Sequence, residues 1–303
     1  MSAWLSLLVL LAIAPLLPAI ATRVISTLSG RRGIPLLQPY RDLGRLARKD
    51  FVYSSTTTFV FRAAPLAWVL GALAAAVLLP LDGHGAIVRF PGDLVLLAGL
   101  LARGRFALAL AALDTGSSFE GMGASRELLI GCLAEPVLFV ALLTLALATH
   151  GASLSDLFGA PLAPAWPRVG ASLVMTVLAL SMLLLAEAAR GPVDDPATHL
   201  ELTMIHEVMV LDHGGLDLAL VLYGTGLRFA LFGSLLVNLL WPLDATPAIA
   251  APLRLALGLA VVAAVVGVVE SSMARLRLVR LPQYLVSAGV LASLGALLLL
   301  RKP

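Results

Sequence analysis

Apolar residues fill long stretches of this chain, and shorter segments between them hold most of the charges. A bilayer core about 30 Å thick takes about 20 residues of helix to cross. Runs of about that length occur at residues 3–24, 61–80, 93–113, 128–149, 169–188, 218–241, 252–272 and 282–300. The pattern predicts an all-α, polytopic membrane protein of about eight transmembrane helices, with residues 1–303 as a single integral membrane domain.

The composition is typical of a membrane protein and excludes several kinds of site. Of the 303 residues, 60% are hydrophobic and 13% are charged, which excludes an ordinary soluble domain. The formal net charge of +3 gives no reason to expect nucleic-acid binding. Cys132 is the sole cysteine, so the chain forms no internal disulfide and cannot by itself supply the thiolates of an iron–sulfur cluster. If electrons matter to this protein, they travel in a partner.

The first apolar run and the distribution of basic residues predict how the chain crosses the membrane. No basic residue precedes the first apolar core, so we expect a retained helix, kinked near Pro15 and Pro18, instead of a cleaved signal peptide. Arginine and lysine gather in the odd-numbered connections. The positive-inside rule then predicts a multi-pass protein of the cell inner (cytoplasmic) membrane, with those connections cytoplasmic and both termini periplasmic.

The connection between the fifth and sixth runs concentrates acidic residues. Residues 186–217 hold seven of the 18 acidic residues in the chain: Glu187, Asp194, Asp195, Glu201, Glu207, Asp212 and Asp217. Asp195 followed by Pro196 is a good helix start, and Gly214 with Gly215 supplies a stop. We therefore predict an amphipathic cytoplasmic helix of about 17 residues, over 196–212.

Two acidic residues, Glu201 and Asp212, fall on the apolar side of this expected helix. Carboxylates there must be paired, protonated or set against a water-filled cavity, because burying an isolated charge costs too much. The alternative is a helix that lies flat on the membrane with its acidic side chains reaching water. We favour an inward cluster that shares protons, made of Glu187, Asp194, Glu201 and Glu207.

Three histidines in the same segment raise the question of a metal site. His199, His206 and His213 follow one another at intervals of seven residues, so neighbours would stand about 10 Å apart along a helix. One ion cannot bridge that gap, and paired histidine ligands on a helix normally sit three or four residues apart. A site that combines one of these histidines with distant ligands stays open.

The connection after the first run is the most basic part of the chain. We predict a helix from Tyr40 to Lys49 that carries positive side chains around one flank: Arg41, Arg45, Arg48 and Lys49. These charges could act only as a topology signal near lipid phosphates. Gly33 and Pro35 instead indicate a turn that holds the chain in a docked position before this helix. We expect a soluble partner to cover the basic flank.

Several ionisable residues lie within the apolar runs. Glu135 sits two turns into the fourth run, directly before Pro136, and a carboxylate at membrane depth is a functional candidate by default. The alternative is an interfacial acid paired with Arg126 or Arg103. Between the third and fourth runs we expect a glycine-rich loop. Arg228, in the sixth run, should face the bundle and find an acid.

Three motifs carry a resemblance to a known family. The stretch AEAARGPVDDPATHLELTMIHEVMVLD resembles the acidic cytoplasmic loop of the membrane subunit shared by respiratory complex I (its subunit 1) and membrane-bound group 4 [NiFe] hydrogenases. The stretches GSSFEGMGASRELLIGCLAEP and GIPLLQPYRDLGRLARK are similar to the hydrogenase branch, of the formate hydrogenlyase and hydrogenase 4 type.

The resemblance implies a non-catalytic membrane subunit that anchors soluble [NiFe] hydrogenase large and small subunits and lies beside antiporter-like membrane subunits. The [NiFe] centre and the iron–sulfur clusters would belong to those partners, and this chain would hold no cofactor. Carboxylates at the positions of the family's acidic motifs would couple redox chemistry to proton movement: Glu135, Glu187, Asp194, Asp195, Glu201 and Glu207. Residues of the basic connection would contact the soluble partner: Arg32, Gln38, Arg41, Asp42, Arg45, Arg48 and Lys49.

Two other functions stay open at this point. The chain could be the quinone-site membrane subunit of an NADH:quinone oxidoreductase, the complex I branch of the same family. It could also be an autonomous ion transporter, although the sequence lacks the paired, interrupted half-repeats that such transporters use.

Overall fold

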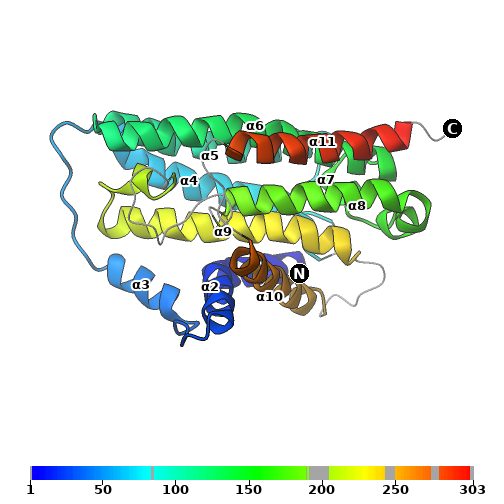
Figure 1. Cartoon of the computed structure of the whole chain (residues 1–303), viewed down its shortest axis with the longest axis horizontal. Helices are drawn as coiled ribbons and strands as arrows, with labels where there is room; N and C mark the ends of the chain where they lie inside the picture. Colours follow the sequence, from blue (N-terminus) through cyan, green and yellow to red (C-terminus); the bar gives the residue numbers. More distant parts are fainter. Residues whose placement is uncertain are drawn as a thin grey trace.

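The protein is a bundle of long α-helices (Figure 1). The computed structural model describes residues 2–82, 85–188, 190, 205–242, 250–273 and 280–300. Seven helices in these ranges are long and apolar enough to cross a membrane: α4 (Phe59–Leu78), α5 (Asp93–Asp114), α6 (Ser118–Thr149), α8 (Leu162–Glu187), α9 (Gly215–Leu240), α10 (Ala250–Ser272) and α11 (Leu281–Leu300). A bent pair, α1 (Ser2–Ile13) and α2 (Leu16–Leu28), raises the number of spans to as many as eight. The predicted architecture is confirmed.

The break in the first span has a clear chemical cause. α1 and α2 meet at 48°, because Pro15 has no N–H to donate to the Leu11 carbonyl and so ends the first segment. The Tyr223 hydroxyl donates to the Leu11 carbonyl at 3.2 Å, and the Tyr40 hydroxyl donates to the Ala12 carbonyl. The predicted kink is therefore confirmed, and side chains from two other helices cap the carbonyls at the break.

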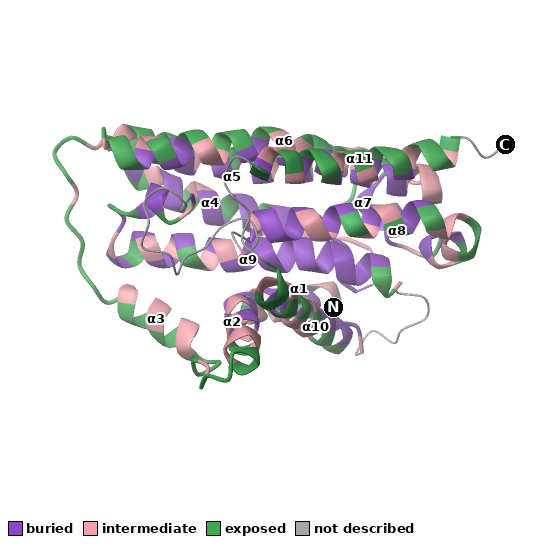
Figure 2. Ribbon diagram, viewed as in Figure 1, coloured by how far each residue is buried: buried purple, intermediate pink, exposed green. Residues whose placement is uncertain are grey.

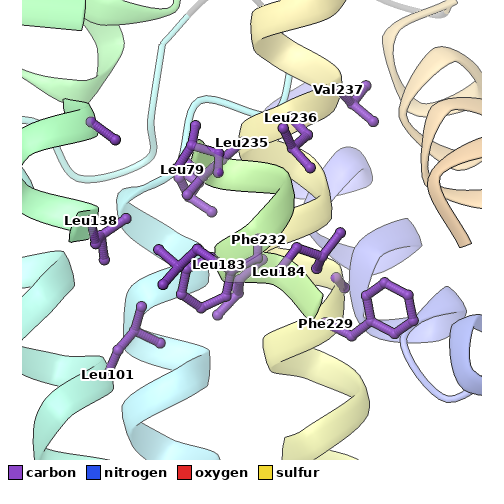
Figure 3. Packing of buried hydrophobic residues seen from close by; sticks show 14 of the residues in the cluster. Leu79, Leu101, Leu138, Leu183, Leu184, Phe229, Phe232, Leu235, Leu236 and Val237 are labelled. Carbon is purple, nitrogen blue, oxygen red and sulfur yellow. The ribbon is translucent and has the colours of Figure 1, made fainter. Parts of the chain in front are cut away.

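α9 forms the centre of the bundle. Its most apolar segment is 78% buried, whereas that of α11 is only 22% buried. Figure 2 shows the same contrast, with α9 mostly purple and the outer faces of α6 and α11 largely green. In Figure 3, Phe229, Phe232 and Leu235 of α9 pack near Leu183 and Leu184 of α8. A helix as enclosed as α9 can carry charged side chains only if other side chains of the protein meet them.

The predicted basic helix lies outside the bundle. α3 (Gln38–Leu46) contains no buried residue and begins with Pro39 in its first turn. Figure 1 shows it at the lower left, joined to α4 by a long connection. The prediction of Tyr40 to Lys49 is thus confirmed as a helix, which begins two residues earlier and ends three residues earlier than expected.

Two predicted connections are more helical than expected. The glycine-rich segment is not a loop, because α6 already begins at Ser118 and only three residues separate it from α5. Gly123 suits a helix here because a Cβ at this position would lie 3.1 Å from Met209 Cγ, so its absence allows close packing. Residues 150–168, which separate the predicted runs 128–149 and 169–188, contain α7 (Leu154–Leu157) and the first turns of α8.

The expected helix over 196–212 does not extend through its second half. Residues 205–213 form turns around a short 3-10 helix, η1 (Val208–Val210). All three residues of η1 are buried, and the Asp212 N–H donates to Glu120 Oε1 at 3.0 Å instead of to a preceding carbonyl. Residues 191–204 lie outside the described ranges, and with them the predicted positions Asp194, Asp195, His199 and Glu201.

Candidate functional site

A single arginine in the middle of the bundle contacts three carboxylates. Arg105 of α5 is 4% exposed, and its Nε lies 3.2 Å from Glu127 Oε1 of α6. Its Nη1 lies 3.5 Å from Glu135 Oε1, about two turns further along the same face of α6, and its Nη2 pairs with Glu187 of α8. Gly131 makes room for the guanidinium, because a Cβ there would lie 2.5 Å from Arg105 Nη1.

A second arginine completes the cluster. Arg228 of α9 is 2% exposed, and its Nη1 lies 3.7 Å from Glu187 Oε2. Its guanidinium also donates to the Leu101 carbonyl and sits 4.1 Å from the ring centroid of Trp68. The prediction that Arg228 faces the bundle and finds an acid is therefore confirmed, and the acid is Glu187.

The ion-pair cluster holds one more acid than base. We use this name for its two arginines and three glutamates: Arg105, Arg228, Glu127, Glu135 and Glu187. Guanidinium groups stay charged in proteins, whereas closely spaced carboxylates resist being ionised together. With all five side chains ionised, the cluster would therefore carry one surplus negative charge.

The cluster lies between a cavity and an outer groove. The cavity, of about 290 Å³, opens between the break of the first span, α3 and α9. Its polar lining consists of Asp42, Arg190, His206, Glu207 and Thr225. The outer groove runs between α5 and α6, where the Glu135 side chain is 38% exposed. Ionisable groups therefore reach from the cavity into the bundle and out to its other side.

His206 joins the cavity to the ion-pair cluster. Its ring lies 3.2 Å from Thr225 Oγ1 and its centroid is 5.5 Å from that of Trp68, the ring on which Arg228 stacks. On the other side of the cavity, Arg190 donates to the Pro18 carbonyl at 3.0 Å and lies 3.8 Å from Glu270 Oε2.

The predicted relay residues separate into three groups. Glu135 and Glu187 meet at Arg105, so the alternative in which Glu135 pairs with Arg126 or Arg103 is wrong. Glu207 lines the cavity. The remaining three, Asp194, Asp195 and Glu201, fall in the segment outside the described residues, so the predicted four-acid cluster stays a prediction.

Neither Glu127 nor Arg105 was assigned a role from the sequence. A signal was present, because Glu127, Gly131 and Glu135 follow at intervals of four residues and share one face of a helix. A small residue between two acids on one face leaves space for a long partner side chain. The partner itself comes from another helix, and only the fold brings it there.

The predicted docking residues lie on and around α3. The basic ones are exposed: Arg32, Arg41, Arg45, Arg48 and Lys49. Gln38 and Asp42 face inward and are hydrogen-bonded to each other at 3.0 Å. Arg45 pairs with Asp42 within the helix, which leaves Arg41 and Arg48 as the more available positive charges on this surface.

The histidines form no metal site within the described ranges, where no group of three or more His, Cys, Asp or Glu side chains could hold an ion. His213 is 4% exposed and stacks on Phe61, with ring centroids 4.0 Å apart. Burial lowers its pKa to about 4, so the ring is neutral near pH 7.

A family model and two bacterial proteins match most of this chain. A family model described as NADH dehydrogenase matches residues 2–301. Hydrogenase-4 component C of Escherichia coli (strain K12) is 35% identical over 234 residues, which cover 77% of this chain and 73% of the relative. Formate hydrogenlyase subunit 4 of the same organism is 34% identical over 281 residues, which cover 89% of each chain.

A solved structure shares the fold. A chain of the membrane-bound sulfane sulfur reductase, an archaeal respiratory membrane complex, superposes with a TM-score of 0.78 over 99% of this chain and 100% of that chain. The two sequences are 18% identical, so this similarity supports the architecture alone.

Proposed function

The chain belongs to the NADH dehydrogenase family of membrane proteins, and from that premise we propose that it is the membrane subunit of a membrane-bound [NiFe] hydrogenase complex. In this role it anchors the soluble hydrogenase large and small subunits and couples their redox chemistry to proton translocation. The names of the two Escherichia coli relatives support the hydrogenase branch of the family.

The ion-pair cluster is the observation that carries the coupling role. The cluster has three carboxylates and two guanidinium groups, so the uptake of one proton would neutralise its surplus negative charge. A change of charge at the cavity would act on the cluster through His206, which lines the cavity and packs against Trp68, the ring on which Arg228 stacks. The outer groove then offers Glu135 as the group through which a proton leaves.

The anchoring role draws on α3 and on the cysteine content. The exposed basic side chains around α3 suit an acidic surface of a soluble subunit, and burial of such charges against the wrong sign costs several kcal/mol. With one cysteine in the chain, the iron–sulfur clusters and the [NiFe] centre belong to the partners. We further propose that α3 lies on the cytoplasmic side of the membrane and that both termini are periplasmic.

A second candidate function is favoured by the cavity. Its lining is mainly apolar, with polar groups from Asp42, Arg190 and His206, and ligand sites commonly combine an apolar wall with a few polar groups. A quinone headgroup would fit that description, as the NADH:quinone oxidoreductase alternative requires.

Purification of the chain with its partners tests the choice. An affinity tag on this chain, solubilisation in a mild detergent and mass spectrometry of the bound proteins should identify [NiFe] hydrogenase large and small subunits, with hydrogen evolution in the same fraction. An NADH-binding module with quinone reduction would instead support the second candidate. A chain that purifies alone and transports ions would support the autonomous transporter.

A further inference from the structure

We propose that the outer groove between α5 and α6 is covered by a membrane-spanning helix of a second membrane subunit, which places a carboxylate against Arg103. The proposal rests on the proposed function only in assuming that this chain works within a membrane complex. It assigns that complex one contact surface on this chain and states the chemistry of the neighbour.

Arg103 is an unusual charge for a membrane protein. It lies near the middle of α5 and its side chain is exposed. Within the described ranges, no carboxylate lies within ion-pair distance of it, since Glu127, Glu135 and Glu187 all contact Arg105. An exposed arginine at the middle of a span needs protein or water beside it, because hydrocarbon offers no partner for the charge.

Other charges in the described spans are placed differently. Arg228 and Arg254 are buried, and Arg62 and Glu270 lie near the ends of α4 and α10. α11 has the least buried apolar segment among the described spans, and its sequence contains no Asp, Glu, Lys, Arg or His. Lipid therefore suits the outer face of α11, whereas it does not suit the groove around Arg103.

The shape of the groove fits a helix. It has a volume of about 480 Å³ and is lined by Arg103, Phe106, Leu128, Gly131, Cys132 and Glu135. Ala102 contributes a small side chain to the same lining, and small residues at such positions let helix backbones approach closely in membranes. Phe106 is 54% exposed and Leu128 36% exposed, so both offer apolar surface on either side of the polar centre.

Charge complementarity decides what the covering helix carries. The acids of the ion-pair cluster already face arginines, so the group that Arg103 lacks is a carboxylate. A phospholipid phosphate is less suitable, because it lies at the surface of the bilayer, about 15 Å from the centre of a 30 Å hydrocarbon core. The neighbour is therefore a membrane subunit with Asp or Glu near the middle of one helix.

Photo-crosslinking in native membranes identifies the neighbour. Phe106 is replaced by p-benzoylphenylalanine, and in a separate strain Val290, 52% exposed on α11, receives the same residue as the control. We expect Phe106 to yield an adduct with a different membrane subunit, while Val290 yields lipid adducts. Adducts at Phe106 with lipid alone, or with a second copy of this chain, would overturn the proposal.

Charge variants then test the carboxylate. Arg103→Glu should lower the amount of the crosslinked neighbour that co-purifies with the chain by at least about tenfold, because like charges would then face each other, while Arg103→Lys should retain it. The soluble hydrogenase subunits should stay bound in both variants. Retention of the neighbour by Arg103→Glu contradicts this inference alone, whereas wild-type complex without a hydrogenase module contradicts the proposed function alone. If Arg103→Glu fails to accumulate, Arg103→Gln replaces it, and full retention of the neighbour again overturns the inference.

Discussion

At the scale of single residues, burial and partners decide what each charged side chain can do. Glu187 is 5% exposed and pairs with two arginines, whereas Glu135 is 38% exposed and, among the described residues, pairs with Arg105 alone. The same residue type is thus a fixed counter-ion at one position and an accessible acid at another. His213 is a third case, since its environment removes its charge altogether.

The neutral state of His213 predicts a specific pH dependence. Its pKa is about 4 in the folded protein and about 6.5 in the unfolded chain, so the unfolded state binds more protons between these values. Stability therefore falls as the pH is lowered through this window. Between pH 7 and pH 5 we expect a loss of about 2 kcal/mol from this residue.

Thermal unfolding of the purified protein at the two pH values measures the effect. His213→Phe should reduce the difference between pH 7 and pH 5, because phenylalanine can stack on Phe61 without binding a proton. His150, which is exposed, supplies the control, and His150→Asn should leave the difference unchanged. An unaltered pH dependence in His213→Phe would show that other groups cause it.

At the scale of helices, the sequence predicted what depends on local pattern and missed what depends on contacts. The spans and the kink at Pro15 follow from apolar runs and from a missing N–H, which are visible in the sequence. The start of α6 was missed because a glycine such as Gly123 reads as a loop signal until Met209 packs against it. The pairing of Glu127 with Arg105 depends on the way α5 and α6 face each other, which no local pattern specifies.

The capped break in the first span gives an energetic prediction. Tyr223→Phe removes the donor to the Leu11 carbonyl, which Pro15 leaves without a backbone partner. We expect a loss of about 1 kcal/mol, the net contribution of a typical hydrogen bond, because this one is partly buried. Tyr284→Phe is the matched control, because its acceptor, the Met182 carbonyl, lies inside a continuous helix. Equal losses in chemical denaturation would argue against special importance of the break.

The exposed basic surface of α3 predicts how the soluble module is held. Arg41→Glu combined with Arg48→Glu should release the hydrogenase subunits at moderate salt, because both side chains are exposed and neither pairs within the described chain. The fraction of the module retained on the tagged chain measures this. Arg168→Glu, an exposed site near the opposite end of the bundle, should have no effect. Full retention in the double variant would place the docking surface elsewhere.

At the scale of the whole molecule, the central question is whether the ion-pair cluster connects its two sides. The cavity near α3 lies where the soluble module is proposed to dock, and the outer groove lies where a second membrane subunit is proposed to pack. Arg105 and Arg228 hold the glutamates between these surfaces. The proposed sites of docking and of proton release are therefore separate on this chain, and variants can test them independently.

Glu135→Gln in the intact complex tests that connection. Glutamine keeps the shape of the side chain but cannot release a proton, and the partial exposure of Glu135 lets the fold tolerate the change. In sealed vesicles that turn over hydrogen, we expect turnover to continue while acidification of one side falls at least about tenfold, since loss of a proton-transfer group typically costs about 100-fold. Glu187→Gln should instead prevent assembly, because removing one partner of a buried ion pair costs about 3–5 kcal/mol. Asp156→Asn, at a surface pair with Arg89, is the control and should leave both quantities unchanged. Normal acidification by Glu135→Gln would show that Glu135 is structural and that protons, if they move, take another route.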